Sequence, residues 1–441
     1  MNNFKYIDLF AGCGGLSLGL DRCGFKSILA VEKSDMAAET YFHNFIEPIK
    51  DINSWKEFSA VETPVIKQAQ KGLVIKELEK VLECDELIDN LKAQDIDLIA
   101  GGPPCQGFSL AGRRDPKDKR NMLPWQFLDL VEKLDPKAVV LENVSGIRQN
   151  FKKHNADSPF EQLRIALSDI GYVVQPVLLN AMYYGVPQHR PRVMLIGLRS
   201  DIASKLGISS SEEIWKSEYS FETSLDRPDL APLATHNEKQ FLTVQDAFKG
   251  LRKTTINHNK RNHADQVISR FRLYQYLRDN GIPTRVLNIA AASETDAVKL
   301  FEIKKFLNGA NFPAISPDGT KIADDIDQLA ELILLLATKK HSQRPLELQK
   351  PSPTVVTLPD DYVHPTEPRT LTVREMARLQ SFPDDFEFRG KETTGGLKRR
   401  VEVPQYTQVG NAVPPLMAEA VGRMLFDILE KANPQPVKKA G

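Results

Sequence analysis

Short apolar runs alternate with longer stretches of helical length through the first half of the chain. Five of these runs have the size of buried strands, and they lie at residues 6–10, 28–31, 96–100, 138–141 and 193–196. Apolar strands separated by helices are typical of crossover units, in which helices cover both faces of a largely parallel sheet. We therefore predict an α/β fold, with ligands bound at the carboxyl edge of its sheet.

Two segments depart from this alternation. Residues 76–97 carry eight acids against three lysines, so we interpret the longer stretch 55–95 as a solvated helical insertion without a chemical role. Beyond Arg199, residues 205–350 combine polar loops and proline-containing turns with one apolar helix near 326–337. This change of pattern predicts a second lobe.

A compact pattern returns near the C-terminus. Thr372 is followed three residues later by Glu375, which is the spacing of a capping box at the start of a helix. The chain ends in a short polar tail that we expect to be disordered. The predicted units, in chain order, are a first core segment, a second lobe, a second core segment and the tail, at 1–204, 205–350, 351–432 and 433–441.

The charges balance over the whole chain. Its 441 residues contain 58 Lys and Arg and 58 Asp and Glu, which excludes a uniformly basic, histone-like protein and a protein with a polyacidic tail. A neutral total leaves nucleic-acid binding open, because binding needs only one basic face. Residues 252–285 hold eight bases against two acids, with Phe271, Tyr274 and Tyr276 between them. This segment could line a phosphate backbone or form a solvated helix face, and charge alone does not distinguish the two.

Cysteine usage and hydropathy exclude several other classes. The four cysteines, Cys13, Cys23, Cys84 and Cys105, are scattered and form no C-x-x-C pair, so we expect neither a disulfide framework nor a metal site. The longest apolar run, 332–337, is far shorter than the roughly 20 residues that span a bilayer. The N-terminus also lacks the pattern of a signal peptide. We expect a cytoplasmic protein that does not bind membranes.

The first strand runs into a glycine-rich turn. Residues 8–15 read Asp-Leu-Phe-Ala-Gly-Cys-Gly-Gly and lead into a helix from about Leu16. Glycines there let a ligand approach the backbone N–H groups at a helix N-terminus, although the pattern also suits a plain tight turn. Glu32 ends the second strand, where a carboxylate can hold both hydroxyls of a ribose. Together these features indicate a cofactor that contains adenosine, either NAD or S-adenosylmethionine.

Further reactive side chains follow the later strands. Cys105 comes after two prolines, which hold its thiol rigidly, and a buried structural cysteine is the alternative. Glu142 ends the next strand and could share a cleft with Cys105, or it could cap a helix or pair with a cation. Arg190 and Arg192 alternate before the last strand, so one of them can face the cleft unless both contact phosphate or the surface. Asn411 lies in a turn that enters a helix and by itself would pass as a cap.

These blocks resemble, in the same order, the motifs of the DNA cytosine carbon-5 methyltransferases. The matching blocks are the turn at 10–15, Glu32, Pro103-Pro104-Cys105-Gln106, Glu142-Asn143-Val144, Gln188-x-Arg190-x-Arg192, Arg374-Glu375-x-x-Arg378-Leu379-Gln380-x-Phe382-Pro383 and Gln408-x-Gly410-Asn411-Ala412-x-Pro414. The match covers roughly residues 1–200 and 340–430. The resemblance implies a Rossmann-like, S-adenosylmethionine-dependent methyltransferase with a mostly parallel sheet, and a smaller mixed target recognition domain at 205–350.

The resemblance also implies a role for each reactive residue. The thiolate of Cys105 would attack carbon-6 of cytosine and make carbon-5 nucleophilic enough to accept a methyl group. Glu142, protonated in a dry pocket, would donate to ring nitrogen 3. Arg192 would contact the carbonyl oxygen of the base, with Arg190 nearby at the base or the backbone. The cytosine must leave the duplex stack to reach these groups.

The implied ligand contacts form two sets. The residues expected to bind S-adenosylmethionine are Phe10, Gly12, Gly14, Glu32, Asp51, Ile52, Pro104 and Asn411. The residues expected to contact DNA lie in a loop that closes over the flipped cytosine, and they are Gln106, Ser109 and Arg120. The sequence departs from the family at Lys33, where an aromatic residue often follows the ribose-binding acid. That departure affects one stacking contact with the adenine.

We expect double-stranded DNA as the partner, a monomeric protein, and a restriction-modification setting with a cognate endonuclease. A tRNA cytosine carbon-5 methyltransferase resembles the same catalytic series, but the long region at 205–350 favours DNA, since reading a sequence needs a dedicated lobe. A DNA-binding regulator without activity is disfavoured by the presence of Cys105 and Glu142. A nicotinamide-dependent oxidoreductase is disfavoured because Ser17 stands where the last glycine of its fingerprint belongs.

Overall fold

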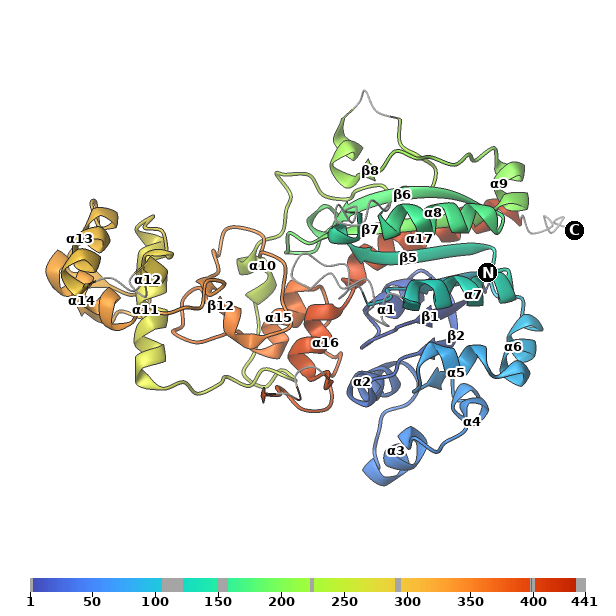
Figure 1. Ribbon diagram of the computed structural model, residues 1–441, viewed down its shortest axis with the longest axis horizontal. Helices are drawn as coiled ribbons and strands as arrows, with labels where there is room; N and C mark the ends of the chain where they lie inside the picture. The colour runs from blue at the N-terminus through green and yellow to red at the C-terminus, as the bar shows by residue number, and fades with distance from the viewer. Residues whose placement is uncertain are drawn as a thin grey trace, which may run out of the picture.

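The protein is built around one large sheet. A computed structural model describes residues 3–104, 122–148, 158–222, 226–289, 295–396, 398 and 401–433. The sheet has eight strands in the order β3-β2-β1-β4-β5-β7-β6-β8 (Figure 1). Its strands are β1 (Lys5–Leu9), β2 (Lys26–Val31), β3 (Leu73–Val74), β4 (Leu98–Gly101), β5 (Ala138–Val144), β6 (Tyr172–Asn180), β7 (Pro191–Arg199) and β8 (Trp215–Lys216).

The strands from β3 to β5 run parallel, whereas β7 is antiparallel to both of its neighbours, β5 and β6. The predicted α/β fold with a mostly parallel sheet is therefore confirmed. Our sequence analysis missed β6, whose apolar run is broken by Gln175 and Pro176. The predicted strand at 193–196 lies in β7. Its direction follows from the short connection after β6, because a parallel crossover needs a dozen or more residues.

Helices cover both faces of the sheet. On one face, α1 (Gly15–Arg22), α9 (Ser200–Leu206) and α17 (Pro415–Ala432) contribute to a buried apolar core. On the other face, α5 (Leu78–Leu82), α6 (Asp85–Lys92), α7 (Leu123–Leu134) and α8 (Pro159–Asp169) contribute to a second core. A Cβ atom at Gly19 would lie 2.5 Å from the Cβ of Ala418, so this glycine lets α1 and α17 approach closely. Helix α17, near the C-terminus, therefore packs against α1, near the N-terminus, on one face of the sheet.

The segment 55–95 is more than the solvated insertion that its charge suggests, and that interpretation was wrong. It contains the end of α3 (Ile52–Ser59), the helices α4 (Val65–Ala69), α5 and α6, and the strand β3 at the edge of the sheet. Leu78, Val81 and Leu91 are buried in the second core. The acids dominate the composition because each short helix turns one polar face to solvent.

A second lobe lies apart from the large sheet, at the left of Figure 1. Its elements are α11 (Asp265–Asp279), α12 (Val286–Ile289), α13 (Asp296–Phe306), α14 (Ile326–Leu335), β9 (Ala314–Ile315) and β10 (Lys321–Ala323). Phe271, Tyr274 and Tyr276 are buried in the core of this lobe. They therefore do not line a nucleic acid together with the neighbouring bases, and that part of the prediction was wrong. Because β8 pairs with β6, residues just after 205 also belong to the large sheet.

The remaining elements are short helices and strands that follow strands of the large sheet, connect the lobe to it, or precede α17 in the C-terminal part of the chain. They are α2 (Asp35–Phe45), η2 (Ser145–Arg148), η3 (Ala181–Tyr184), η4 (Ser217–Phe221), α10 (Val244–Phe248), β11 (Arg344–Pro345), η5 (Pro359–Asp361), β12 (Tyr362–Val363), α15 (Val373–Leu379) and α16 (Gln405–Asn411). The predicted capping box of Thr372 and Glu375 is present at the start of α15. In the part of the chain that the structure describes, no helix has the length and apolar character to cross a membrane. The boundaries of the predicted domains stay a prediction.

Candidate functional site

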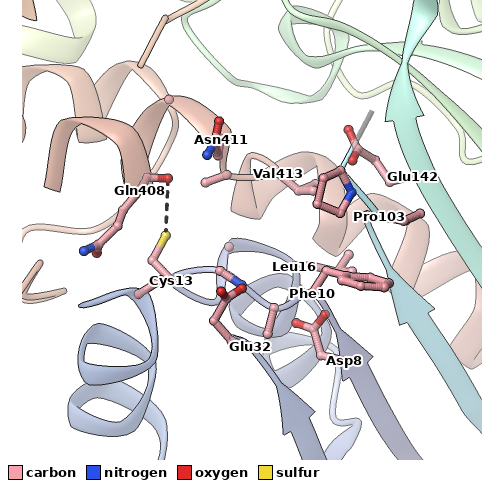
Figure 2. Close-up of a pocket in the computed structure, with 18 of the residues that line it drawn as sticks. Asp8, Phe10, Cys13, Leu16, Glu32, Pro103, Glu142, Gln408, Asn411 and Val413 are labelled. Carbon is pink, nitrogen blue, oxygen red and sulfur yellow. Dashed lines mark hydrogen bonds between the residues drawn. The ribbon is translucent and has the colours of Figure 1, made fainter. Parts of the chain in front are cut away.

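A cavity of about 320 Å³ lies where β1, β4 and β5 end. Residues from five of the segments that line it are labelled in Figure 2. Phe10 and Glu32 follow β1 and β2, Pro103 and Glu142 stand at β4 and β5, and Asn411 comes from the C-terminal segment. This is the carboxyl edge of the parallel part of the sheet, where open α/β folds bind their ligands.

The glycine turn after β1 is shaped by left-handed backbone angles. Phe10 has φ of 60° and Gly12 has φ of 57°, and a bulky residue such as phenylalanine rarely adopts this region without a functional constraint. A Cβ atom at Gly12 would meet nothing within 4 Å, so this residue leaves open space at the cavity wall. A Cβ atom at Gly14 would lie 2.2 Å from the Phe45 ring. Gly14 does not line the cavity, and it acts as the N-cap of α1.

The Glu32 carboxylate is held by backbone donors at the floor of the cavity. One oxygen accepts from the N–H of Gly12 at 2.9 Å, and the other accepts from the N–H of Ser34 at 2.7 Å. Burial raises the pKa of Glu32, and these hydrogen bonds act in the opposite direction. Each oxygen keeps further acceptor capacity, so the carboxylate can also bind two hydroxyls of a ligand.

Asp8 is a cavity residue that the sequence analysis did not identify. It is 1% exposed, and its Oδ2 accepts a hydrogen bond from Ser17 Oγ at 2.6 Å. Its Oδ1 has no hydrogen-bond partner within the described residues. Burial raises the pKa of Asp8 to about 7, and the negative charge of Glu32 adds to that effect. A buried acceptor without a partner is costly, and such an atom at a cavity wall suits a ligand that brings a donor or a positive charge.

Glu142 and Arg192 form an ion pair at the other end of the cavity. Arg192 Nε lies 3.0 Å from Glu142 Oε1, and Glu142 is 8% exposed. Burial raises the pKa of Glu142 despite the two arginines, Arg192 and Arg190, that lower it. The next residue, Asn143, donates from Nδ2 to the carbonyl oxygen of Pro103 at 3.0 Å. This hydrogen bond ties the end of β5 to the backbone that leads toward Cys105.

The Arg190 guanidinium points to backbone oxygens. It donates to the carbonyl oxygens of Val355 at 3.1 Å, Gly410 at 2.9 Å and Ala412 at 2.9 Å. The side chain is 1% exposed and lines the cavity, and burial lowers the pKa of Arg190. Arg190 therefore fastens the C-terminal segment to the start of β7.

Three glutamines stabilise the same wall, and the sequence analysis gave them no role. Gln408 Nε2 donates to the carbonyl oxygens of Met36, Arg389 and Val403, and Gln408 Oε1 accepts from Thr40 Oγ1 at 2.7 Å. Gln188 Nε2 donates to Gln380 Oε1 at 2.9 Å, and Gln380 Nε2 donates to the carbonyl oxygen of Val409 at 2.7 Å. These glutamines lie inside the matched motif blocks, which was the one sign in the sequence that they have a role. Their hydrogen-bond partners could not be predicted, because they come from distant parts of the chain.

The predicted cofactor residues are only partly brought together. The cavity is lined by Phe10, Gly12, Glu32, Pro104 and Asn411. Asp51 and Ile52 do not line it. Asp51 caps α3 by accepting from the N–H groups of Asn53 and Ser54, and Ile52 is 47% exposed. The predicted residues Cys105, Gln106, Ser109 and Arg120 lie outside the described residues. Among the described residues, no group of three or more His, Cys, Asp or Glu could hold a metal ion.

Known proteins are similar to this chain over nearly all of its length. The model of the family described as C-5 cytosine-specific DNA methylase matches residues 4–427. Type II methyltransferase M.DdeI of Desulfomicrobium norvegicum is 33% identical over 430 residues, which are 97% of this chain and 89% of that protein. Type II methyltransferase M1.HphI of Haemophilus parahaemolyticus is 30% identical over 435 residues, which are 96% of this chain and 87% of that protein.

A solved structure supports the same fold. It is described as a putative DNA modification methyltransferase encoded within a prophage of Escherichia coli, and it aligns with a TM-score of 0.56 at 24% identity. The alignment covers 97% of this chain and all of that one. With a family model that spans almost every residue and relatives of this similarity, the chain belongs to the C-5 cytosine-specific DNA methylase family.

Proposed function

We propose that this protein methylates carbon-5 of a cytosine flipped out of duplex DNA, as the modification enzyme of a restriction-modification system. The observation that carries the proposal is the Glu142 carboxyl group, which is 8% exposed, has a raised pKa and pairs with Arg192 inside the cavity. Such a group can reach a ring nitrogen only when the base itself enters the cavity. A duplex substrate must therefore release one base from its stack.

The cavity fits S-adenosylmethionine, which supplies an electrophilic methyl group when bound. Glu32 would hold the ribose hydroxyls, and the open space at Gly12 would let the backbone approach the ligand. The unpartnered Oδ1 of Asp8 offers an acceptor, and above its raised pKa of about 7 the Asp8 carboxylate carries a negative charge that suits a cationic ligand. Pro104 and Asn411 would contact the ligand from the other walls. The expected contacts of Asp51 and Ile52 with the adenine remain part of this proposal.

In the proposed mechanism, Cys105 and Glu142 act on the base together. The Cys105 sulfur forms a bond with carbon-6, and the displaced electron pair moves through the ring while Glu142 gives its proton to nitrogen 3. Carbon-5 then has the electron density to take a methyl group, and the bond between that group and the sulfonium sulfur of bound S-adenosylmethionine would break with its electron pair left on the sulfur. When the proton on carbon-5 leaves, its electron pair restores the double bond, the thiolate departs, and nitrogen 3 returns its proton to Glu142. Burial raises the pKa of Glu142, which favours the protonated form that this step needs.

The two arginines have different proposed roles. The Arg192 guanidinium lines the cavity beside Glu142 and would stabilise charge on the carbonyl oxygen of the base. Arg190 is a positioning residue, because its guanidinium donates to backbone oxygens of the C-terminal wall. Gln106, Ser109 and Arg120 would contact the DNA around the flipped base.

A transfer assay tests the proposed function directly. Purified protein is given methyl-labelled S-adenosylmethionine with either duplex DNA or tRNA, and bisulfite sequencing of DNA from an expressing host then locates the modified cytosines. We expect label in duplex DNA at one recurring sequence. Preferential labelling of tRNA would favour the alternative, a tRNA cytosine carbon-5 methyltransferase, and no label in either would contradict the proposal. A protein that migrates as a monomer would agree with the expected assembly state.

The Glu32→Gln variant tests the cofactor site. Glutamine keeps the size of the side chain, but its amide group faces one of the two backbone N–H donors, so one charged hydrogen bond is lost. Such a bond contributes about 1.5–3 kcal/mol, so we expect KM for S-adenosylmethionine to rise about 10- to 100-fold with a smaller change in kcat. Glu47→Gln is the control, because Glu47 is exposed and pairs with Lys71. An unchanged KM in Glu32→Gln would show that the ribose does not bind there.

The Gly102→Ala variant tests whether the Glu142 carboxyl position matters. A Cβ atom at Gly102 would lie 2.8 Å from Glu142 Oε2, so alanine must displace the carboxyl group from its position. A displacement of about 1 Å in a reacting group can cost on the order of 10²-fold in rate, and we expect a loss of that size in kcat. Binding of S-adenosylmethionine, measured by calorimetry, should change little. Normal kcat in this variant would contradict the placement of Glu142.

A further inference from the structure

Four cations gather where the second lobe joins the catalytic domain. Arg261, Lys339, Lys340 and Arg344, here called the junction strip, lie on the segments that lead into α11 and out of α14. Lys339, Lys340 and Arg344 are exposed, and the Arg261 side chain is 34% exposed. Arg261 Nη1 and Lys340 Nζ approach the same carboxylate, Asp360, at 3.4 Å and 3.5 Å. The two segments therefore meet at one surface.

The junction strip holds more positive than negative charge. Asp360 is shared by two cations, and the neighbouring Asp361 accepts a hydrogen bond from Ser342 Oγ at 2.7 Å. The Arg344 guanidinium lies over the Tyr362 ring, 5.6 Å from its centroid, which orients the charge without neutralising it. Long ion pairs between exposed side chains contribute little free energy. These cations can therefore exchange their partners for an external anion.

Tyr362 connects the junction strip to the cavity. It is the strand partner of Arg344 in the β11–β12 pair, and its hydroxyl donates to the carbonyl oxygen of Thr354 at 2.6 Å. The next residue, Val355, accepts a hydrogen bond from Arg190 Nη1 at 3.1 Å. Because Arg190 lines the cavity, a short chain of direct contacts leads from the cavity to the cations.

We propose that the junction strip binds phosphates of the duplex DNA backbone next to the flipped cytosine, an inference that rests on the proposed function. A base that enters the cavity leaves its neighbouring phosphates outside, and the contacts through Tyr362 and Arg190 connect this cavity to the junction strip. Exposed lysine and arginine side chains bind these phosphates without reading the sequence. In the free protein Asp360 holds two of the cations in place, and phosphates replace it on binding.

The slope of DNA affinity against salt tests this proposal. The dissociation constant of a fluorescent duplex of random sequence is measured from 50 to 200 mM NaCl for the parent, for Lys339→Ala/Lys340→Ala and for Arg344→Ala. Each lost phosphate contact should lower the slope of log K on log salt by about 0.9, so that the affinity ratio between the two salt concentrations falls by ~3-fold per contact. Asp360→Asn should tighten binding, since it frees both of its cations.

Lys321→Ala is the matched control. Lys321 is an exposed lysine of β10 in the same lobe and pairs with Asp324 at 2.8 Å, so its removal should leave the slope unchanged. Slopes of the strip variants equal to that of the parent, or weaker binding by Asp360→Asn, would overturn the proposal. A parent protein that binds no duplex DNA would contradict the proposed function itself, and this outcome is separate from a loss confined to the junction strip.

Discussion

Replacing Cys105 by serine is expected to lower the rate of methyl transfer to duplex DNA by roughly 10⁴-fold or more, with nearly unchanged affinity for S-adenosylmethionine. A thiol with a pKa near 8.5 supplies a few per cent thiolate at neutral pH, whereas a serine hydroxyl supplies essentially no alkoxide. The cavity residues that we expect to bind the cofactor, such as Glu32 and Gly12, are not altered by this change. Single-turnover transfer and calorimetric binding of the cofactor measure the two effects separately.

A trapped adduct provides the positive counterpart of this result. In duplex DNA that contains 5-fluorocytosine, carbon-5 carries fluorine in place of the proton that must leave, so the bond between sulfur and carbon-6 cannot break. We expect a covalent complex with the parent protein and none with Cys105→Ser. Cys84→Ser is the control, because Cys84 is a half-buried cysteine that precedes α6 and does not line the cavity. Normal turnover by Cys105→Ser would contradict the covalent mechanism.

Local pattern predicted the central strands well, because β1, β2, β4 and β5 each contain a short run of mostly apolar, buried residues. The same criterion failed for β6, which contains Gln175 and Pro176. Gln175 is buried because its Nε2 donates to the carbonyl oxygen of Ser209 and its Oε1 accepts from the N–H of Leu230. Both partners come from distant residues, and no local pattern reveals them. The interpretation of Tyr274 and its neighbours as DNA-lining residues failed for a related reason. Charge counts do not show which face of α11 is buried.

The candidate site was predictable where a strand end fixes the direction of a side chain. Phe10 and Glu32 follow parallel strands and Glu142 lies near the carboxyl end of β5, so they meet at one edge of the sheet and line one cavity. The partners of a long side chain depend on tertiary contacts, and the alternation of Arg190 and Arg192 could not show that Arg190 donates to Gly410 and Ala412. Asp8 was not predicted as a cavity residue because it lies within β1. The pattern of hydrophobic and polar positions does not show that an acid inside a strand lines a cavity.

The second large effect is expected from Glu142→Gln, which should lower kcat by about 10²- to 10⁴-fold, the range of a lost general acid. Glutamine preserves the shape of the side chain but has no acidic proton to give to nitrogen 3. The parent should also show a characteristic pH dependence. Because burial raises the pKa of Glu142, the carboxyl group can donate below that raised pKa, and kcat should fall as pH rises through it. This alkaline decrease should be absent from the residual activity of Glu142→Gln.

Glu39→Gln is the matched control for this experiment. Glu39 Oε1 contacts Arg389 Nε at 3.0 Å, the same distance and atoms as in the pair of Glu142 with Arg192. Its side chain is 15% exposed, close to the 11% of Glu142, but Glu39 does not line the cavity. A general need for buried ion pairs would lower kcat in both variants, whereas proton donation to the base lowers it only in Glu142→Gln. Equal losses, or an unchanged pH profile in Glu142→Gln, would remove Glu142 from the proposed chemistry.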